Sequence, residues 1–554
     1  MTRLRIFVAW FVLIAAAPAA AAPGQAAVAS AHPLATEAGL SILAAGGNAF
    51  DAAVAVSAAL SVVEGYSSGI GGGGFWLLHR ASDGHQVMVD GREVAPLAAT
   101  RDMYLDANGQ PLPRLSKDGV LAAGIPGVPA GLEHISRNYG ELSLAETLAP
   151  AIRLAGEGFP LDARMHRGLT FKRDLLAGFP GSAATFLVGG DVPPVGHLIR
   201  QPALARTLER IAESGAAGFY RGPVAEALVR GVRAEGGIWS LEDLAGYSVK
   251  ERPPVTFEYQ GVTVVAASLP SAGGIALANI FNILDGYRFT DMDRVNRIHL
   301  LTEAMRRAYR DRAQYLGDPD FVSVPVGQLV HPYYAAGQRA TIRLDRATPS
   351  AVLPPAYRQR EAEDTSHFSV LDEAGNRVAG TQSINGWFGS GYVEPETGVM
   401  LNNEMDDFSV KPGQPNLFEL VGAEANEVAP GKRMLSSMTP TFLESDRGVA
   451  ILGTPGGSRI ISMVLLASLA WMDGADAETM VSLPRFHHQY LPDQLIYEPE
   501  AFTAEEIAAL EALGHELKVS SRRYGNMQVV TWDRATGKVA AASDPRGQGK
   551  SRIY

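Results

Sequence analysis

Hydrophobic and polar residues recur with two different periods along the chain, and these periods separate predicted helices from predicted strands. Residues 34–63 have helical spacing with small, alanine-rich faces, and Gly46-Gly47-Asn48 interrupts them. The pattern predicts two closely packed helices with a break between them. Residues 295–316 carry apolar side chains at helical spacing and stop before Gly317-Asp318-Pro319, which predicts a third, longer helix.

Predicted strands come in consecutive pairs joined by short polar turns. The pairs are 75–79 with 86–90, 367–372 with 377–385, 441–442 with 449–452, and 527–532 with 538–542. Consecutive pairs of this kind are typical of hairpins rather than of strand-helix-strand units. We therefore expect antiparallel sheets with helices layered outside them.

The N-terminus has the pattern of a secretory signal peptide. Arg3 and Arg5 precede an apolar run over residues 6–17, and small residues ending at Ala22 follow it. The run is too short for a comfortable membrane span. We therefore assign residues 1–22 to a signal peptide and expect a periplasmic or secreted protein without a stable membrane anchor.

Length and composition limit the fold and the kind of ligand. A chain of 554 residues exceeds the usual size of one core, which favours two domains or one large layered α/β body. The net charge of -11 argues against nucleic-acid binding, because that function needs clustered Lys and Arg. The sequence has no Cys, which excludes disulfides and a thiol nucleophile. A small-molecule or peptide ligand is the better prediction.

A run of four glycines, Gly71 to Gly74, allows two interpretations. Consecutive backbone N–H groups in such a loop can converge on an anion. The run lacks the Lys-Ser/Thr of a phosphate-binding loop, and it leads from a predicted helix into a predicted strand, whereas a dinucleotide fingerprint follows a strand and opens a helix. We therefore favour a close approach of two backbones at this point.

Two polar clusters raise the question of a metal site. The stretch from Asn402 to Phe408 is rich in acids and amides and could bind calcium, hold an ammonium group or form a solvated loop. It lacks the ligand spacing of an EF-hand. His487 and His488 are adjacent, so they share no face of a helix or strand, which argues against zinc. We predict no metal and no cofactor.

Small polar residues supply further candidates. Ser436-Ser437 and Gly456-Gly457 could line an oxyanion or carboxylate site, or could form ordinary turns. Thr365 follows Asp364 at the start of a predicted strand, an ordinary place for a β-branched residue.

The order of these motifs resembles the γ-glutamyltranspeptidase family. The motifs are SSGIGGGGF at 67–75, DGREVAP at 90–96, DTSHFSVLD at 364–372, LNNEMDDFS at 401–409, RMLSSMTPT at 433–441 and GTPGGSRI at 453–460. The resemblance extends from about Leu34 to the C-terminus. It implies the four-layer αββα sandwich of the N-terminal-nucleophile hydrolases, built as one structural domain.

The resemblance gives Thr365 a special role. In this family an inactive precursor cuts itself before a threonine, and the matching bond here is Asp364-Thr365. This implies a large subunit of residues 23–364 and a small subunit of residues 365–554. A free α-amino group, with a pKa of roughly 7.7–8.0, can act as the base for the adjacent hydroxyl. His367 is then not needed as a base, and we interpret it as structural.

The family's other functional residues match positions in this chain. Ser383 would orient Thr365, although the family usually has threonine there. The N–H groups of Gly456 and Gly457 would form the oxyanion hole. The α-carboxylate of the glutamyl group would meet Arg92, Ser436 and Ser437, and its α-ammonium would meet Asn385, Glu404 and Asp407.

The implied activity is γ-glutamyl transfer and glutathione hydrolysis. Glutathione and related amides would donate the γ-glutamyl group to water, an amino acid or a peptide. Residues 412–432 resemble the family's lid loop, with Phe418 where tyrosine is common. A glutaryl or cephalosporin acylase, which would bind no α-ammonium, and a non-catalytic periplasmic binding relative are the alternatives.

Overall fold

The structure is a computed structural model that describes residues 22–112, 114–353, 365–414, 416 and 420–554. Its centre consists of two antiparallel sheets, with seven and six strands among the described residues. The order in the first is β18 (Lys550–Ile553), β1 (Ala27–Ser30), β9 (Ser366–Leu371), β10 (Arg377–Ser383), β2 (Gly73–Arg80), β3 (His85–Gly91) and β6 (Lys250–Arg252).

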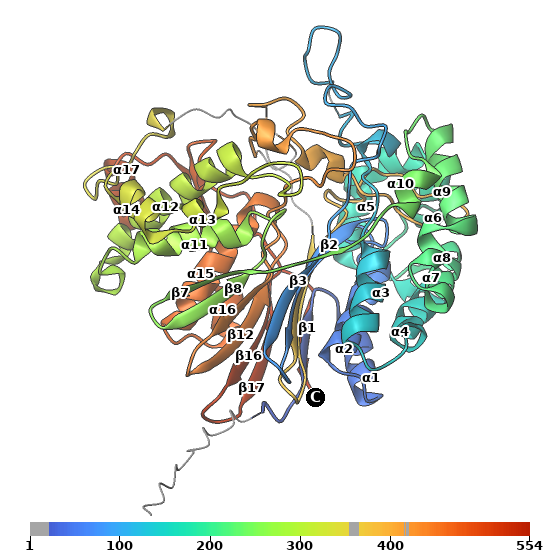
Figure 1. Cartoon of the computed structure of the whole chain (residues 1–554), viewed down its shortest axis with the longest axis horizontal. Coiled ribbons are helices and arrows are strands. Elements are labelled where there is room, and N and C mark those ends of the chain that lie inside the picture. Colours follow the sequence, from blue (N-terminus) through green and yellow to red (C-terminus); the bar gives the residue numbers. More distant parts are fainter. Residues whose placement is uncertain (1–21, 113, 354–364, 415, 417–419) are drawn as a thin grey trace, which may run out of the picture.

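The second sheet packs against the first (Figure 1). Its order is β17 (Val539–Ser543), β16 (Gln528–Asp533), β12 (Gly448–Gly453), β11 (Thr441–Glu444), β8 (Val262–Ala266) and β7 (Val255–Tyr259). Smaller sheets join β4 (Phe159–Pro160) to β5 (Leu198–Ile199), and β13 (Phe486–His487), β14 (Leu495–Tyr497) and β15 (Leu517–Val519).

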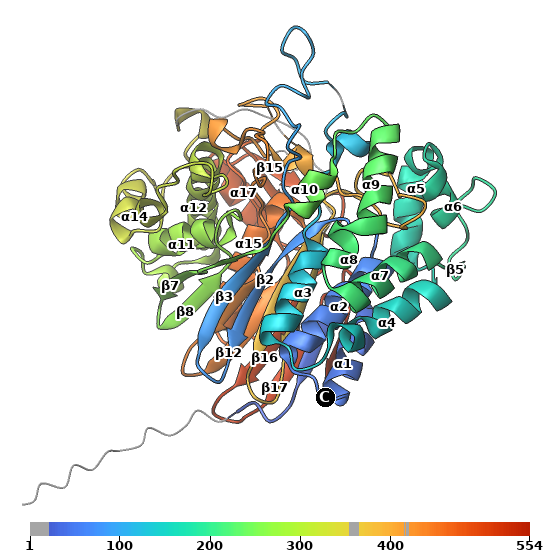
Figure 2. The same ribbon diagram turned by 45° about the vertical axis from the view of Figure 1, so that its right-hand side comes forward.

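Helices cover the outer face of each sheet, as Figures 1 and 2 show from two directions. Over the first sheet lie α1 (Pro33–Ala44), α2 (Ala49–Val63), α3 (Val128–Tyr139), α4 (Leu144–Glu157), α5 (Ala163–Ala177), α6 (Pro180–Phe186), α7 (Pro202–Ser214), α8 (Ala217–Tyr220), α9 (Gly222–Ala234) and α10 (Leu241–Ala245). Over the second lie α11 (Gly273–Leu284), α12 (Arg294–Tyr315), α13 (Val326–Leu329), α14 (Pro332–Arg339), α15 (Ile460–Met472), α16 (Ala477–Ser482) and α17 (Ala504–Ala512). The predicted αββα sandwich is confirmed.

The first sheet is buried on both faces. Along β2, Phe75 and Leu77 join the core that contains the second sheet, whereas Trp76 and Leu78 join the core under helices α1 to α10. This follows from the alternation of side chains along a strand. All six residues of β9 are likewise buried, so the strand that follows Thr365 is held from both sides.

Most predicted elements form where the sequence pattern placed them. Helices α1 and α2 are separated at Gly46-Gly47-Asn48, and Asn48 caps α2 by accepting hydrogen bonds from two backbone N–H groups. The predicted hairpins appear as β2-β3, β9-β10, β11-β12 and β16-β17. One boundary was wrong: the strand predicted to reach Asn385 ends at Ser383, because Asn385 adopts a left-handed conformation with φ 72°.

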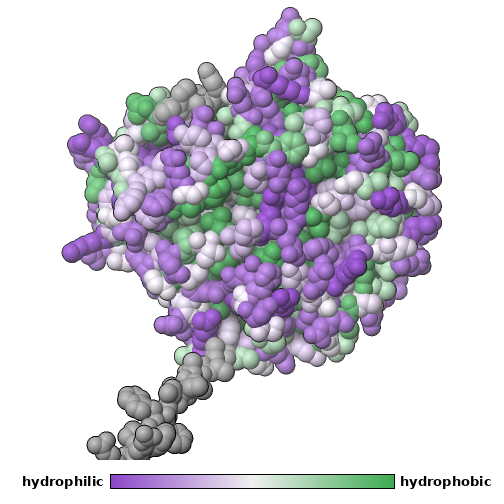
Figure 3. Space-filling view, viewed as in Figure 1, coloured by the Kyte–Doolittle hydropathy of each residue, from purple (hydrophilic) through white to green (hydrophobic). Residues whose placement is uncertain are grey.

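The surface mixes hydrophilic and hydrophobic residues, as the space-filling view shows (Figure 3).

In the described part of the chain, no helix has both the length and the apolar character needed to cross a membrane. The segment after β3 projects from the top of the molecule, and hydrophilic side chains cover much of it (Figure 3). The predicted signal peptide, except for Ala22, lies outside the described residues, as do Asp364 and Phe418.

Candidate active site

The predicted site residues gather at one end of the sandwich. Ser383 at the end of β10 pairs with Gly73 at the start of β2, Thr365 precedes β9 at the same end, and Arg92 follows β3. One pocket opens among them. It is lined by Arg92, Arg312, Thr365, Ser383, Asn385, Glu404, Asp407, Leu420, Ser436, Ser437, Met438, Gly457 and Ile460. Nine of the ten predicted site residues therefore share one pocket, and Gly456, the tenth, adjoins it.

Thr365, just before β9, lies beside Ser383, the last residue of the neighbouring strand β10. Their hydroxyl oxygens are 3.4 Å apart, and Thr365 is only 4% exposed. The Ser383 hydroxyl also accepts a hydrogen bond of 2.8 Å from the N–H group of Asn385. This second bond fixes the Ser383 side chain, so its hydroxyl is held beside that of Thr365.

The glycine run supports Ser383 from behind by a close backbone approach, as predicted. A Cβ atom on Gly72 would collide with the carbonyl oxygen of Ser383, and one on Gly71 would collide with that of Met400. Only glycine allows chains to pass this closely. The loop before β2 therefore sets the position of the strand end that carries Ser383.

Arg92 is paired with both predicted ammonium-binding acids rather than held apart from them. Its guanidinium donates to Glu404, and to Asp407 over 2.5 Å, while its Nε donates to the carbonyl oxygen of Met434 over 3.1 Å. Burial opposes the charged form, but the attraction of Glu404, Asp407 and Glu93 outweighs it and raises the pKa of Arg92. Arg92 was predicted to bind the α-carboxylate of the substrate, and Glu404 and Asp407 its α-ammonium. In the structure these three side chains meet, because each charge is buried and needs a partner.

The acidic side of the pocket has capacity for a further cation. The Oε2 atom of Glu404 is buried and has no hydrogen-bond partner within the described chain. Burial raises the pKa of Glu404, and also that of Asp407, against the opposing charge of Arg92. Asp407 accepts a hydrogen bond of 3.0 Å from the Asn416 amide. An ammonium group placed here would find an unused acceptor.

Glu93 stands behind this cluster. Its side chain is fully buried, lies 3.6 Å from the Arg92 guanidinium, and has no hydrogen-bond partner for either oxygen among the described residues. Burial raises its pKa to about 7, with Arg92 acting in the opposite direction. Glu93 was not predicted to be a site residue, although it directly follows Arg92.

Arg312 is a second cation that the sequence analysis missed as a site residue. It lies in α12, is 4% exposed, and donates from Nη2 to the Ser437 hydroxyl over 3.2 Å. Burial lowers its pKa to about 10, against the attraction of Asp407. Arg312, Ser436 and Ser437 therefore form a polar wall near Arg92 that suits a carboxylate.

Gly456 and Gly457 form a turn between β12 and α15. Both have positive φ, 141° and 53°, which favours glycine. Both are buried, and neither backbone N–H group donates a hydrogen bond to another group in the described part of the chain. Unused buried donors are rare. The turn therefore offers two donors beside the pocket that contains Thr365.

The predicted lid loop contacts the pocket. Leu420 lines it, and Asn416 bonds to Asp407 as described above. Phe418, where the sequence departs from the family, lies outside the described residues. The described parts of residues 412–432 thus contact the acidic side of the pocket.

The buried histidines have contacts of their own away from the nucleophile. His367 Nδ1 lies 2.8 Å from the hydroxyl of Thr381, and burial lowers its pKa to about 3, so it is neutral near pH 7. His487 and His488 point to different partners, Ser462 and Asp493 respectively. These contacts agree with the structural interpretation of His367.

Comparisons with known proteins give a consistent family. A family profile described as Gamma-glutamyltranspeptidase matches residues 35–554. The chain is 41% identical over 505 residues to the glutathione hydrolase proenzyme of Pseudomonas sp. (strain A14), covering 90% of this chain and 87% of that protein.

Two solved structures are also similar. The cephalosporin acylase from Bacillus halodurans superposes with a TM-score of 0.83 at 29% identity, covering 99% of each chain. The γ-glutamyltranspeptidase of Helicobacter pylori superposes with a TM-score of 0.58 at 43% identity, covering 59% of this chain and 94% of that one. The overall fold is thus similar to that of proteins with either activity. The side chains of the pocket must distinguish the two activities.

Proposed function

Because the chain belongs to the γ-glutamyltranspeptidase family, we propose that it cleaves the γ-glutamyl amide bond of glutathione and related compounds with Thr365 as its nucleophile. The observation that carries the proposal is the single pocket in which Thr365 and Ser383 lie beside clusters of both charges. An amino-acid head group carries one positive and one negative charge. Few other substrates need a cationic cluster and an acidic cluster close to an acyl-transfer nucleophile.

The proposed reaction has two steps. The Thr365 hydroxyl attacks the γ-carbonyl carbon and passes its proton to the α-amino group of the same residue. The C–N bond breaks, the proton moves to the leaving amine, and a γ-glutamyl ester on Thr365 remains. Water or the amine of an acceptor then attacks the ester, giving glutamate or a new γ-glutamyl amide and returning the proton to the Thr365 oxygen.

The oxyanion of each step would be stabilised by the turn after β12. The N–H groups of Gly456 and Gly457 are buried and unused in the described chain, so they can donate without breaking another bond. Donors placed in advance lower the barrier because no reorganisation is needed during the reaction. Ser383 would hold the Thr365 hydroxyl in line for attack.

The charge of the pocket favours a γ-glutamyl group over a glutaryl group. The α-carboxylate would bind Arg92 and Ser436, together with the wall of Arg312 and Ser437. The α-ammonium would bind the unused oxygen of Glu404, with Asp407 and Asn385 beside it. A glutaryl group brings the carboxylate without the ammonium, so it would add a negative charge beside Glu404 and Asp407 with no further cation to offset it, which is costly.

Maturation would create the base that the reaction needs. We propose cleavage at Asp364-Thr365, giving subunits 23–364 and 365–554 after removal of a signal peptide at 1–22. The relative's description as a proenzyme supports processing, and the Helicobacter pylori chain matches only 59% of this one, close to the share of such a large subunit. A periplasmic or secreted location follows from the signal peptide.

Two measurements test this proposal together. Intact mass and N-terminal sequencing of the exported protein should give a fragment beginning Thr-Ser-His-Phe, and Thr365→Ala should stay whole. The matured protein should hydrolyse γ-glutamyl-p-nitroanilide at least about tenfold better than glutaryl-p-nitroanilide, since an uncompensated buried charge costs about 3–5 kcal/mol and a tenfold change needs only about 1.4 kcal/mol. A preference for the glutaryl compound would instead identify an acylase, and an uncut chain without activity would indicate a binding protein.

A further inference from the structure

A buried carboxylate, Asp90, lies behind the proposed binding site for the α-carboxylate, and the proposed mechanism does not use it. Asp90 is the last residue but one of β3 and is fully buried. It does not line the nucleophile pocket, which contains Thr365, whereas Arg92, two residues later, does. A buried charge is costly without partners, so the contacts of Asp90 show which groups it holds.

One oxygen of Asp90 holds the backbone of Arg92. Its Oδ1 accepts a hydrogen bond of 3.0 Å from the Arg92 N–H group. The carbonyl oxygen of Arg92 accepts another hydrogen bond, of 2.8 Å, from the Tyr247 hydroxyl. Both backbone groups of Arg92 are therefore fixed, and its side chain reaches the nucleophile pocket from an anchored position.

The other oxygen of Asp90 contacts two arginines. Its Oδ2 accepts a hydrogen bond of 2.7 Å from Nε of Arg252, on the neighbouring strand β6. The same oxygen forms an ion pair with Nε of Arg433 across 3.4 Å. Arg252 has a further acidic partner, Asp320, at 2.6 Å. Loss of the Asp90 charge would therefore leave Arg252 paired, whereas Arg433 would lose this ion pair.

Arg433 connects Asp90 to the second half of the carboxylate site. The residue after it, Met434, accepts a hydrogen bond of 3.1 Å from Nε of Arg92 through its carbonyl oxygen. The serines at 436–437 follow closely and line the nucleophile pocket. Asp90 therefore ties Arg92 to the segment that carries these two serines.

The proposed cleavage at Asp364-Thr365 would place these contacts between two subunits. Asp90 and Arg92 would belong to the large subunit, and Arg433 to the small one. The ion pair between Asp90 and Arg433 would then join the subunits directly behind the nucleophile pocket, without a covalent link.

We propose that Asp90 is a positioning residue for the α-carboxylate of the substrate, because it fixes Arg92 of the large subunit relative to Ser436-Ser437 of the small one. The inference rests on the proposed function, since it needs an α-carboxylate between these groups. Hydrogen bonds to a carboxylate are directional, and a displacement of roughly 1 Å takes them out of their range. Asp90 acts through Arg92 and Arg433 and does not itself touch the substrate.

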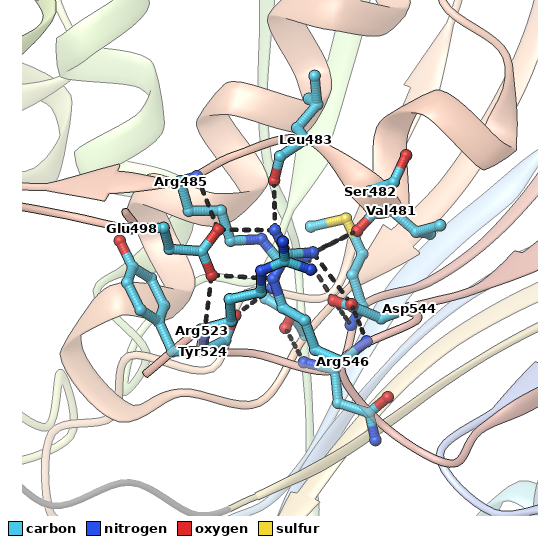
Figure 4. A network of polar contacts seen from close by, with 12 residues as sticks. Val481, Ser482, Leu483, Arg485, Glu498, Arg523, Tyr524, Asp544 and Arg546 are labelled. Atoms are coloured by element: carbon cyan, nitrogen blue, oxygen red, sulfur yellow. Dashed lines mark hydrogen bonds and ion pairs between the residues drawn. The ribbon is translucent and has the colours of Figure 1, made fainter. Parts of the chain in front are cut away.

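The network in Figure 4 supplies a matched control. Asp544 is buried, as Asp90 is. It accepts a hydrogen bond of 3.0 Å from the Met527 N–H group and pairs with Arg485 and Arg546. It does not line the nucleophile pocket. Asp544→Asn therefore removes the same kind of buried charge without altering the proposed carboxylate site.

The test compares two substrates that differ by the α-carboxylate, γ-glutamyl-p-nitroanilide and 4-aminobutanoyl-p-nitroanilide. The second substrate keeps the amine and the scissile amide, so it reports general damage to the nucleophile. Both are assayed with matured wild type, Asp90→Asn, Arg433→Gln, the double variant and Asp544→Asn. Where turnover is slow, first-order release of nitroaniline at high enzyme concentration gives kcat/KM.

We expect Asp90→Asn to lower kcat/KM for the γ-glutamyl anilide about 5- to 50-fold, mainly through KM, and to change the 4-aminobutanoyl anilide less than about threefold. Arg433→Gln should have the same selectivity. The double variant should lose little more than the worse single variant, because both changes act on one contact. Asp544→Asn should change both substrates by the same factor.

Tyr247→Phe gives a second, milder test in case a charge variant does not fold. It removes only the hydroxyl that donates to the carbonyl oxygen of Arg92. It should lower kcat/KM for the γ-glutamyl anilide about two- to tenfold, the effect of one neutral hydrogen bond, and leave the 4-aminobutanoyl anilide nearly unchanged. Thermal unfolding of each variant shows whether it is folded.

Equal changes for the two substrates in Asp90→Asn and Tyr247→Phe, or additive losses in the double variant, would overturn the positioning role and leave the proposed function intact. A wild type that cleaves both substrates equally well would also overturn it, since no α-carboxylate contact would then need positioning. Failure of the matured wild type to cleave the γ-glutamyl anilide would refute the proposed function, and the positioning role with it.

Discussion

Alanine at Gly72 would test how firmly the glycine run holds the catalytic strand end. A methyl group there collides with the carbonyl oxygen of Ser383, lies 3.0 Å from the carbonyl carbon and 2.8 Å from a methyl carbon of Ile384. Ordinary contacts between carbon atoms are about 3.5–4.0 Å, so the strand end must retreat by roughly 0.5–1 Å. Turning the Ile384 side chain would not remove the collision, because the nearest obstacle, the Ser383 carbonyl group, is backbone.

The expected cost has two parts. Overpacking of this kind destabilises a protein by about 1–3 kcal/mol. A displacement of about 1 Å near the reacting groups lowers the rate by up to about 100-fold. We therefore expect Gly72→Ala to lower kcat about 10- to 100-fold, with a smaller change in KM, because Ser383 orients the nucleophile and does not hold the head group in our proposal.

Gly69→Ala is the matched control for this experiment. A methyl group at Gly69 would lie 3.4 Å from Ile384, an ordinary contact, and Gly69 belongs to the same loop. Both variants would be compared by intact mass, thermal unfolding and kcat for γ-glutamyl-p-nitroanilide. If Gly72→Ala matched Gly69→Ala in processing, stability and rate, the argument that the glycine run positions Ser383 would be wrong.

Two further predictions concern buried charges near Arg92. Arg312→Gln should raise KM for γ-glutamyl-p-nitroanilide about 10- to 100-fold, since a hydrogen bond to a charged group contributes about 1.5–3 kcal/mol; an unchanged KM in steady-state kinetics would remove Arg312 from the carboxylate wall. Glu93 has a folded-state pKa of about 7, above its usual 4.5, so the folded protein binds its proton more tightly than the unfolded chain. Its contribution to stability is complete below about pH 4.5 and is lost as the pH rises towards 7. Glu93→Gln should therefore flatten the decline of unfolding free energy over that interval by up to about 3 kcal/mol, and denaturant titrations showing parallel curves for both proteins would contradict this.

The strand pairs were predictable because each is a local pattern with its own turn. The two-sided burial of β9 and β10 was not evident from that pattern, since it depends on a second sheet formed by residues far along the chain. No prediction covered helices α3 to α10. A signal existed in α7, where Leu204, Leu208 and Ile211 recur at helical spacing and are buried.

Only the site residues that belong to the family's sequence motifs were predictable. The resemblance named the residues that the fold brings together, but it did not indicate Arg312, whose place in α12 is explained equally well by helical spacing alone. Arg312 reaches the site because α12 passes Ser437, 125 residues later in the chain. Such a contact depends on how the two sheets pack, which no local pattern encodes. The pairing of Arg92 with Glu404 and Asp407 was missed for the same reason.

The serine at position 383 shows how local structure can substitute for a missing methyl group. Threonine, usual at this place in the family, restricts its own side-chain rotation by branching at Cβ. Ser383 lacks that restriction, yet its hydroxyl accepts a hydrogen bond of 2.8 Å from the N–H of Asn385. That bond requires the chain to turn back at once, which the left-handed conformation of Asn385 achieves. The turn that ends β10 therefore also holds the hydroxyl beside Thr365, so the loss of branching need not loosen the nucleophile.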